Sequence, residues 1–540
     1  MPPILDTDSP GRPTAPPVEV VISLISHTNV GKTTLARTLL GRDVGEVRDA
    51  AHVTEFVEEH LLLQSSGGQR LVLCDTPGFG DSARLAQRMR QAHRPLGWLL
   101  TQVWDRWRDR PFWGTQQALR HVRERSDVVL YLVNAAESPE AMPHLAAELE
   151  ILGWLERPVI VLLNQLGAPQ PADQEAAEVQ RWARHLQAQA VPGLRLHEVL
   201  PLDAFARCWV QEAVLMQTLV AAVPADRQSA MAALAQTAAA QGQATFAASM
   251  AVLAEGLVAM AGVRVALDEP GADGWRQRLA AVLPRAGEAS SPAAAPADPR
   301  ARAEAALREH TEALARSGTD RLLALHGLAG DARAEILARV AQQIELHQPV
   351  SEGRAALWGG VVSGALAGLK ADLATGGLTM GGGLLAGSLL GALGAAGLTR
   401  GLNVLRGTES TWAVWPDDAW APLGQAALLR YLAVAHFGRG RGAWTAGEAP
   451  PHWAARVAQA LEAERPALQT AWRLAREHRE ETGAPTPEPG APVDAAAHAR
   501  VAAQRDLAAA LQRCATAVLQ GLYPQAGAAW RQGAPSSSTP

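Results

Sequence analysis

The chain has 540 residues and a formal net charge of −5 at pH 7, so it is long enough for two or more domains and shows no whole-protein attraction to nucleic acid. Charged residues make up only 19% of the chain, and its many alanines and glycines favour helices packed closely through small side chains. The three cysteines, Cys74, Cys208 and Cys514, are far apart and form no Cys-x-x-Cys pair. This spacing indicates no disulfide framework and no zinc site, and it is typical of a reducing compartment.

The two ends of the chain lack the patterns of folded elements. Residues 1–17 are rich in Pro, Asp and Thr and have no apolar core, so they do not have the pattern of a secretory signal. We expect a disordered leader over 1–17, a disordered polar tail over 531–540, and a protein located in the cytoplasm.

Residues 18–222 alternate between strand-like and helix-like segments. The β-branched and apolar runs predict strands at 18–25, 56–63, 70–75, 128–133, 158–163 and 197–202. The 3.6-residue periodicity predicts helices at 33–41, 140–155, 173–190 and 208–222. This alternation predicts an α/β domain with a doubly wound, mostly parallel sheet, whose ligands bind at the carboxyl ends of the strands.

The stretch VEVVISLISHTNVGKTT at residues 18–34 is the strongest functional motif in the chain. A strand, a loop with Gly31-Lys32-Thr33 and a helix form the arrangement that cradles the phosphates of a nucleotide. Backbone N–H groups and the helix N-terminus point at the anion, Lys32 adds a point charge, and the Thr33 hydroxyl suits Mg²⁺. Ser26 replaces the first glycine of this motif, which weakens the match slightly. The alternative is a chance Gly-Lys-Thr at the start of an ordinary helix.

A second phosphate motif follows 43 residues after Lys32 (75 − 32). The apolar strand LVLCD ends in Asp75 and is followed by Thr76-Pro77-Gly78. A carboxylate at the end of a strand that faces the phosphate loop can hold Mg²⁺ through water. The Gly78 amide can meet the terminal phosphate, because only glycine lets the backbone approach so closely.

These motifs together resemble a P-loop GTPase of the Era/TrmE-like branch of the TRAFAC class, over roughly residues 18–222. Thr-Asn-Val-Gly-Lys-Thr resembles the Pro-Asn-Val-Gly-Lys-Ser of that branch, and Asp75-Thr-Pro-Gly78 matches its magnesium and switch motif. The resemblance implies that Thr33, Thr54 and Asp75 hold Mg²⁺ and that Lys32, Thr54 and Gly78 act in hydrolysis. It also implies a nucleotide-binding set of Asn29, Val30, Gly31, Lys32, Thr33, Thr34 and Asn164.

Two positions bear on how hydrolysis would proceed. Phe79 stands where Ras-type proteins have a catalytic glutamine; Era/TrmE-like proteins also have a hydrophobic residue there. Asn29 falls where some relatives bind K⁺, so the resemblance implies K⁺ as a second cofactor and K⁺-stimulated, dimerisation-assisted hydrolysis. The alternatives are core packing for Phe79 and a turn-stabilising side chain for Asn29.

The base-recognition motif is altered. The resemblance places Asn-Lys-x-Asp after the strand at 158–163, and the chain has Asn164-Gln165-Leu166-Gly167. The asparagine, expected to touch the base, is retained, but the aspartate that accepts hydrogen bonds from guanine is absent. GTP is expected over ATP from the resemblance and not from this motif. The later loop Leu202-Asp203-Ala204-Phe205 weakly matches the loop that offers a backbone amide to the base.

An insertion rich in arginine and tryptophan follows the switch, over residues 83–125. Arginine and tryptophan together suit anionic lipid headgroups, RNA or a protein partner, and we expect a protein partner here. The alternative is a helical insertion whose tryptophans pack on the sheet while its arginines face water.

The rest of the chain is expected to be mainly helical, in two regions at 223–348 and 408–530. Helical periodicity covers 226–281, 300–347, 423–437, 452–478 and 497–522, with low-complexity linkers at 284–300 and 482–492. This part resembles the helical domain of uncharacterised function that is fused to such GTPases in proteobacteria. That resemblance carries no residue roles.

A Gly-rich apolar hairpin is expected within 349–407. Gly360, Gly364 and Gly368 repeat at four-residue spacing, as do Gly383, Gly387 and Gly391, and such glycines let two helices approach closely. Residues 373–398 carry no charge and are long enough for a bilayer. Three alternatives remain for 355–398: a membrane-embedded hairpin, a hairpin exposed on demand to a membrane, and a buried soluble hairpin.

The sequence therefore predicts a GTP-binding protein with slow hydrolysis of GTP to GDP, acting as a membrane-associated switch at the cytoplasmic side of the inner membrane. A nucleotide-dependent homodimer is a further expectation, and nucleic acid is not expected as a partner. Two alternatives stay open. One is a nucleotide-binding scaffold with little turnover, serving partner or lipid recognition, and the other is a ribosome- or RNA-associated assembly GTPase.

Overall fold

The computed structural model describes residues 18–41, 57–91, 110–167, 170–204, 208–267, 299–328, 403–406, 411–437, 451–478 and 495–527. Several expectations lie outside these residues. They are the leader 1–17, Thr54, the centre of the insertion, residues 284–298 of the linker, the Gly-rich hairpin 355–398, the linker 482–492 and the tail 531–540.

The N-terminal domain is built on a six-stranded sheet with the order β2-β3-β1-β4-β5-β6. All pairs are parallel except β2 with β3, so the predicted doubly wound, mostly parallel sheet is confirmed. The six predicted strands are present, with ends shifted by one or two residues. They are β1 (Glu19–Ser26), β2 (Glu58–Gln64), β3 (Arg70–Asp75), β4 (Val128–Asn134), β5 (Pro158–Asn164) and β6 (Arg195–Pro201).

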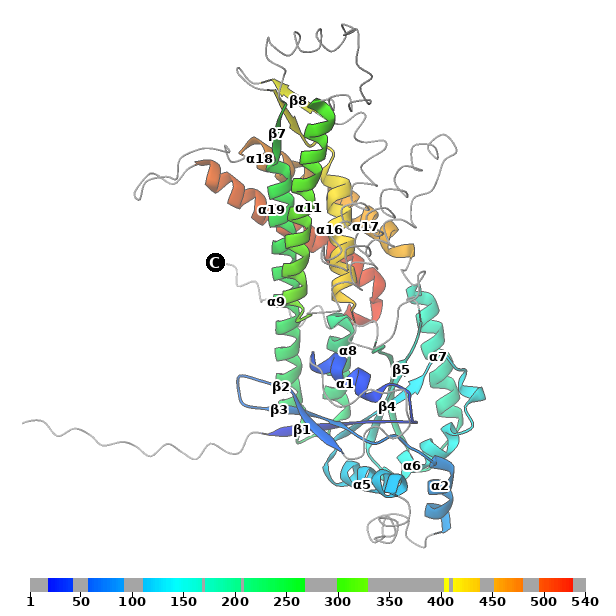
Figure 1. Cartoon of the computed structure of the whole chain (residues 1–540). Coiled ribbons are helices and arrows are strands. Elements are labelled where there is room, and N and C mark those ends of the chain that lie inside the picture. Colours follow the sequence, from blue (N-terminus) through cyan, green and yellow to red (C-terminus); the bar gives the residue numbers. More distant parts are fainter. Residues whose placement is uncertain are drawn as a thin grey trace, which may run out of the picture.

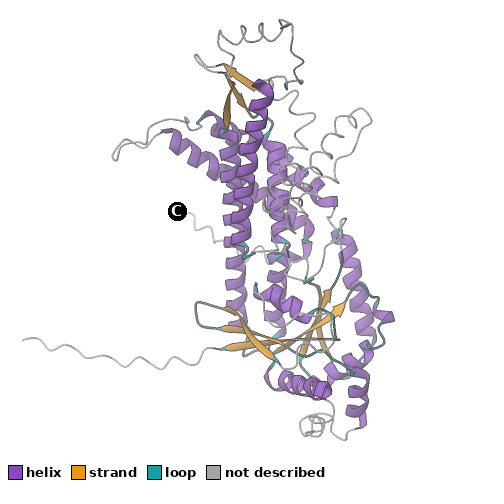
Figure 2. Ribbon diagram, viewed as in Figure 1, coloured by secondary structure: helices purple, strands orange, loops and turns teal. Residues whose placement is uncertain are grey.

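Helices cover both faces of this sheet, as Figure 2 shows. One face packs on α1 and α8, with Leu35 and Leu215 in the same core as Ile22 and Leu24 of β1. The other face packs on the helices that follow β3, β4 and β5, with Leu149 in its core. The helices are α1 (Lys32–Leu40), α2 (Ser82–Gln91), α5 (Arg110–Arg125), α6 (Leu145–Leu155), α7 (Ala172–Ala188) and α8 (Trp209–Ala222).

The helix predicted over 140–155 begins later than expected. A short 3₁₀ turn at Pro139–Ala141 is followed by α6 from Leu145. Pro143 lies between the two, and the ring of proline excludes the continuous α-helical hydrogen bonding that the periodicity indicated.

The C-terminal region is a helical bundle, shown in the upper part of Figure 1. Its helices are α9 (Gln228–Gly262), α11 (Pro299–Leu325), α16 (Trp420–Ala435), α17 (Pro451–Ala463), α18 (Arg465–Glu477) and α19 (Ala495–Leu522), with a final 3₁₀ turn at Pro524–Ala526. The run predicted over 452–478 is therefore two helices, because Pro466 stands in the first turn of α18, where proline starts a helix and cannot continue one. Helix α11 ends at Leu325, and Gly327 follows with a φ of 64°, which stops the helical run predicted to reach 347.

The C-terminal region is mainly helical, as predicted, but it also contains a small sheet that was not predicted. Three four-residue strands, β7 (Arg264–Leu267), β8 (Asn403–Arg406) and β9 (Thr411–Val414), form an antiparallel sheet with the order β7-β9-β8. The first ends the helical run predicted over 226–281. The segments are too short for a periodicity signal, and β7 is paired with a strand about 150 residues later, so only the tertiary structure reveals this sheet.

Helix α9 joins the two parts of the molecule. It is a 35-residue helix, about 52 Å long at 1.5 Å per residue, and it runs from the six-stranded sheet to the small sheet at the far end of the bundle (Figure 1). Met231 and Leu234 belong to the core of the N-terminal domain, whereas Phe246 and Leu253 belong to the core of the bundle. Among the described residues α9 is also the one helix long and apolar enough to cross a membrane, with 50% of its apolar window buried. Because α9 packs into the cores of both parts, we interpret it as a core helix.

Cys74, Cys208 and Cys514 are buried free thiols. Burial raises the pKa of Cys74 and of Cys514 to about 12. Because the thiolate is the reactive form, we expect these two thiols in the native protein at pH 8 to react with iodoacetamide more slowly than a free thiol by about two orders of magnitude or more. Mass spectrometry before and after denaturation in urea checks this; rapid alkylation of Cys74 in the native protein contradicts it.

Candidate functional site

The phosphate loop lies between the end of β1 and the start of α1. Asn29 and Gly31 both have left-handed backbones, with φ of 65° and 98°. Gly31 directly precedes α1 and provides no side-chain cap for its first amides, and a Cβ at Gly31 would lie 2.9 Å from Asn164 Nδ2. Glycine is therefore required here by conformation and by space. The uncapped N–H groups at the start of α1 form an anion site.

Ser26 is the last residue of β1. Its hydroxyl accepts a hydrogen bond from Lys32 Nζ at 3.3 Å and donates one to the carbonyl of His27. As a strand residue it does not need the conformational freedom of glycine. The serine, which seemed a weakness of the motif, therefore costs the loop no backbone strain.

Lys32, Thr33 and Asp75 form the charged centre of the site. The Thr33 hydroxyl donates a hydrogen bond to Asp75 Oδ2 at 2.6 Å. Burial lowers the pKa of Lys32, and the carboxylates of Asp75 and Glu148 oppose this change. Burial likewise raises the pKa of Asp75, against the influence of the Lys32 ammonium. The Lys32 ammonium and the Asp75 carboxylate are thus both buried beside the anion site.

This centre fits a magnesium ion. Asp75 Oδ1 is buried and has no hydrogen-bond partner among the described residues, and the Thr33 hydroxyl lies beside the same carboxylate. Hydroxyl and carboxylate oxygens are the hard donors that Mg²⁺ prefers. Thr33 and Asp75 are therefore the residues that would hold the ion. Thr54, the third expected ligand, lies outside the described residues.

Gly78 lies against the phosphate loop. A Cβ at this position would lie 3.1 Å from the Thr28 Cα and 3.2 Å from Lys32 Nζ, so the backbone approaches the loop more closely than a side chain would allow. The next residue, Phe79, donates its amide to the Ser26 carbonyl at 2.9 Å, and its ring is 1% exposed. Phe79 therefore packs in the core, which was the alternative given for this residue.

Asn164 connects two loops at the edge of the site. Its Nδ2 donates to the Val30 carbonyl at 2.7 Å, and its Oδ1 accepts from the Ala204 amide at 2.8 Å. The side chain is fully buried. Nearby, Asp203 Oδ2 accepts from the Leu166 amide at 2.9 Å. Asn164 is therefore a clamp between the phosphate loop and the loop after β6, and its contact with the base stays a prediction.

The structure brings the predicted site residues of the described chain to one edge of the sheet. Asn29 is exposed in the loop, Thr34 is buried in the first turn of α1, and the other residues lie as described above. The set at this edge comprises Asn29, Val30, Gly31, Lys32, Thr33, Thr34, Asp75, Gly78 and Asn164.

The described part of the insertion, in α2 and α5, packs on the domain. Phe112 is buried, and the guanidinium groups of Arg84 and Arg88 each lie 4.7 Å from its ring centroid. Arg90 pairs with Glu150 of α6, and Arg125 pairs with Glu19 of β1. These arginines serve contacts within the chain. A role of the insertion in binding a partner stays a prediction.

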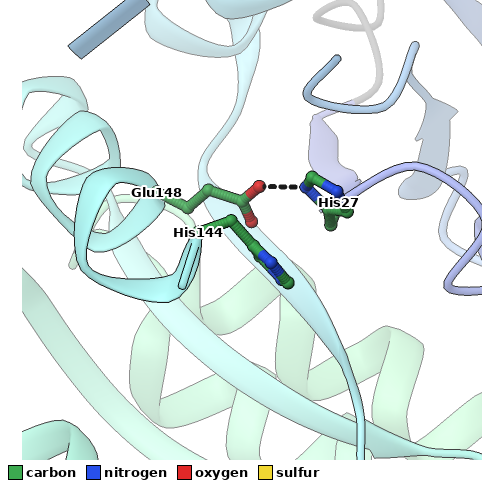
Figure 3. A group of neighbouring side chains, drawn as sticks. All are labelled: His27, His144 and Glu148. Atoms are coloured by element: carbon green, nitrogen blue, oxygen red, sulfur yellow. Dashed lines mark hydrogen bonds and ion pairs between the residues drawn. The ribbon is translucent and has the colours of Figure 1, made fainter. Parts of the chain in front are cut away.

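A group of three side chains beside the phosphate loop was missed from the sequence. The side chains of His27, His144 and Glu148 lie together (Figure 3), with His27 Nδ1 at 2.7 Å from Glu148 Oε1. His27 stands within the loop motif itself. Its partners follow 117 and 121 residues later (144 − 27, 148 − 27), and no local pattern connects them.

Comparison with known proteins agrees with this geometry. The family model described as "50S ribosome-binding GTPase" matches residues 21–165. "GTPase Der" of Geobacillus thermodenitrificans is 28% identical over 199 residues, which are 33% of this chain and 37% of that protein. "GTPase Der" of Rhodopirellula baltica is 28% identical over 179 residues, 32% of each chain. The chain thus spans about a third of the length of these curated relatives.

Two solved structures are similar in part. One is a variant of Era from Aquifex aeolicus bound to GDP·AlF₄⁻, with 19% identity, a TM-score of 0.28, and coverage of 38% of this chain and 57% of the other. The other is an oligomerised bacterial dynamin pair, with 10% identity, a TM-score of 0.24, and coverage of 96% and 70%.

The family model described as "Domain of unknown function (DUF3482)" matches residues 189–503, more than half of the 540 residues. The chain belongs to this family, and its N-terminal part is a GTP-binding P-loop GTPase domain.

Proposed function

We propose that this protein is a GTP-binding switch that hydrolyses GTP slowly and passes its nucleotide state to the helical bundle. The observation that carries this proposal is the phosphate site. The uncapped start of α1, the buried Lys32 ammonium and the Gly78 backbone converge on one place. Phosphoryl transfer requires mainly positioning and charge stabilisation, which these groups supply.

Mg²⁺ would be held by Thr33 and Asp75, and when bound it would neutralise charge on the phosphate oxygens. Lys32 would hold the phosphates as a point charge, and the amide of Gly78 would meet the terminal phosphate. The curated relatives are named as GTPases, and this supports GTP over ATP. The altered Asn164-Gln165-Leu166-Gly167 motif offers no carboxylate to guanine, so discrimination against ATP should be weaker than an aspartate would provide.

Slow turnover is expected because the position after Gly78 carries the buried ring of Phe79, which cannot orient an attacking water. A single-turnover rate on the order of 10⁻³ s⁻¹ or lower is expected, similar to a GTPase without an activating partner.

Exchange of K⁺ for Na⁺ tests the role of Asn29, whose exposed side chain lies in the loop. A rate that rises several-fold in K⁺ supports the K⁺ proposal; equal rates contradict it.

The nucleotide state would reach the bundle through α9. Its first turns pack in the core that contains Leu35 and Leu39 of α1, and its later turns pack in the bundle. Arg227, just before α9, donates to the Glu19 carbonyl of β1 at 3.1 Å. A displacement of β1 or α1 would therefore move α9, and α9 would transmit this movement to the bundle.

Calorimetric titration with non-hydrolysable GTP and ATP analogues, with and without Mg²⁺, is the first test, and a single-turnover assay with GTP itself measures hydrolysis. Tight binding of the GTP analogue together with hydrolysis of GTP favours the switch, and tight binding without hydrolysis favours the scaffold alternative. Absence of binding to either nucleotide overturns both. Nucleotide-dependent co-sedimentation with ribosomes would favour the assembly-factor alternative, which the name of the matched GTPase family also suggests.

Association with a membrane is proposed from residues 355–398 alone, which carry the two glycine runs. Vesicle flotation of the full chain, loaded with GTP analogue or GDP, tests it. Gly387→Asp places a charge in the uncharged run and should abolish flotation, because a charge in the bilayer centre costs about 3 kcal/mol. The same change in the linker, Gly490→Asp, should have no effect. Equal flotation of both variants would contradict a membrane role for this segment.

A further inference from the structure

The side chains of His27, His144 and Glu148 lie together at the beginning of the phosphate loop (Figure 3). Each residue offers one ligand atom, and these atoms all lie within 4.8 Å of one another. His27 follows β1, His144 directly precedes α6, and Glu148 lies in the first turn of α6. The group therefore joins the beginning of the phosphate loop to the start of α6.

The Glu148 carboxylate is an oxygen ligand that interacts with one positive charge of the phosphate site, the Lys32 ammonium. It is fully buried, and an ionised carboxylate in such a place is costly unless a positive charge compensates it. The Tyr131 hydroxyl donates to Oε2 at 2.7 Å, so this partner is a neutral donor. The other oxygen, Oε1, faces His27 Nδ1 at 2.7 Å.

The two imidazoles are stacked, with ring centroids 3.9 Å apart and an interplanar angle of 19°. Two imidazolium ions in this arrangement would repel each other, so at least one ring is neutral. A neutral imidazole is the form that binds metals.

We propose that His27, His144 and Glu148 form a transition-metal site of the zinc type, distinct from the Mg²⁺ site at Thr33 and Asp75. Two imidazole nitrogens and one carboxylate oxygen are the donors of open zinc sites, in which water takes the fourth position. The hydrogen bond from Tyr131 to Glu148 is the kind of outer contact that orients a ligating carboxylate. The cysteine spacing predicted no zinc site, and none of these donors is a cysteine.

The ligand atoms need to move little. Ligands about 2.1 Å from a tetrahedral ion lie roughly 3.4 Å from one another, whereas the present separations are at most 4.8 Å. His144 is partly exposed, so rotation of its side chain can bring it closer. Glu148 stays fixed by Tyr131.

Metal binding would stiffen the nucleotide site. His27 forms a β-bridge with Phe79, and Phe79 directly follows the switch glycine. A metal held by His27 and by the start of α6 would connect the phosphate loop, the switch and α6 through one ion. The site itself does not depend on the proposed GTPase activity.

The test uses the full chain after treatment with a chelator, followed by titration with Zn²⁺ in competition with a chromophoric chelator. We expect one tight equivalent and, with Co²⁺, the visible absorption of a tetrahedral complex. His144→Ala and Glu148→Gln should each lower the Zn²⁺ affinity at least tenfold, and Tyr131→Phe by about tenfold. Glu148→Gln keeps the shape of the side chain, so it separates loss of a ligand from loss of folding; far-UV circular dichroism checks the fold.

The matched control is His121→Ala. His121 lies beside Glu59 and Cys74 in the other group with possible metal ligands among the described residues, and this change should leave the affinity unaltered. The proposal is overturned if Zn²⁺ does not bind, if binding survives Glu148→Gln and His144→Ala, or if His121→Ala removes it. Failure of GTP binding in the same preparation would not affect any of these outcomes.

Discussion

Replacing Lys32 with alanine is expected to lower the affinity for GTP about 100-fold. The Lys32 ammonium is buried beside the start of α1, where it would meet the phosphates with little competition from water. Loss of charge-assisted hydrogen bonds worth about 3 kcal/mol corresponds to two orders of magnitude in the dissociation constant. Calorimetric titration with a GTP analogue and Mg²⁺ measures the change.

Ser26→Gly is the matched control in the same loop. It removes the hydroxyl that lies 3.3 Å from Lys32 Nζ and restores the usual glycine of the motif, so the affinity should change no more than about threefold. If Lys32→Ala binds as tightly as the wild type, the phosphate site and the proposed function are both wrong.

The composition of the chain allows a direct test of occupancy. Lys32 and Lys370 are the only lysines in 540 residues, so acylation of amines followed by mass spectrometry reads the two side chains separately. Because burial lowers the pKa of Lys32, the free ammonium loses its proton more readily than an ordinary lysine. GTP with Mg²⁺ should protect Lys32 and leave the labelling of Lys370 unchanged. Equal labelling of Lys32 with and without nucleotide would contradict binding at this loop.

Asn164→Ala is expected to destabilise the GTPase domain by about 2–4 kcal/mol. The change leaves the Val30 carbonyl and the Ala204 amide buried without their partner, and each unsatisfied buried group costs about 1–3 kcal/mol. It also frees the phosphate loop from the loop after β6, so the affinity for GTP should fall as well. Calorimetric unfolding measures the loss as a lower temperature of the transition of this domain.

Asn134→Ala provides the comparison. Asn134 ends β4 directly opposite Asn164 in the sheet, but its hydrogen bonds to Glu137 and to the Ala136 amide are solvent-exposed. The same substitution there should cost no more than about 1 kcal/mol, because water replaces the lost partner. Similar losses for the two variants would show that Asn164 is not a clamp.

Titration of Asn164→Ala with GTP and with ATP also tests whether Asn164 contacts the base of the nucleotide. Both polar atoms of the Asn164 side chain form hydrogen bonds within the protein. If this structural role is its only role, Asn164→Ala should lower the affinities for GTP and for ATP equally. A selective loss of GTP binding would instead support the predicted contact with guanine. Titration of the variant with both nucleotides distinguishes the two roles.

The sequence by itself determined the N-terminal domain and most of its phosphate site. The four central strands of this sheet, β3, β1, β4 and β5, are buried apolar runs. The local motifs Gly31-Lys32-Thr33 and Asp75-Thr-Pro-Gly78 stand at the ends of two of them. Local patterns of this kind are visible in sequence because neighbouring residues carry the whole signal. The position of the phosphate loop therefore follows from the sequence alone.

Only the tertiary structure decided which distant groups meet. Asn164 forms hydrogen bonds to Val30 and to Ala204 because the parallel strands bring both residues to the carboxyl ends of the sheet. His27 met Glu148 across 121 residues, and β7 paired with a strand far along the chain. Such contacts depend on how layers pack. A one-dimensional pattern does not contain that information, because the burial that offsets the conformational entropy lost in ordering distant segments arises only in the folded chain. Helix α9 illustrates the same limit: its apolar sequence suits a membrane or a core, and its packing into two cores made it the connection between the GTPase domain and the bundle.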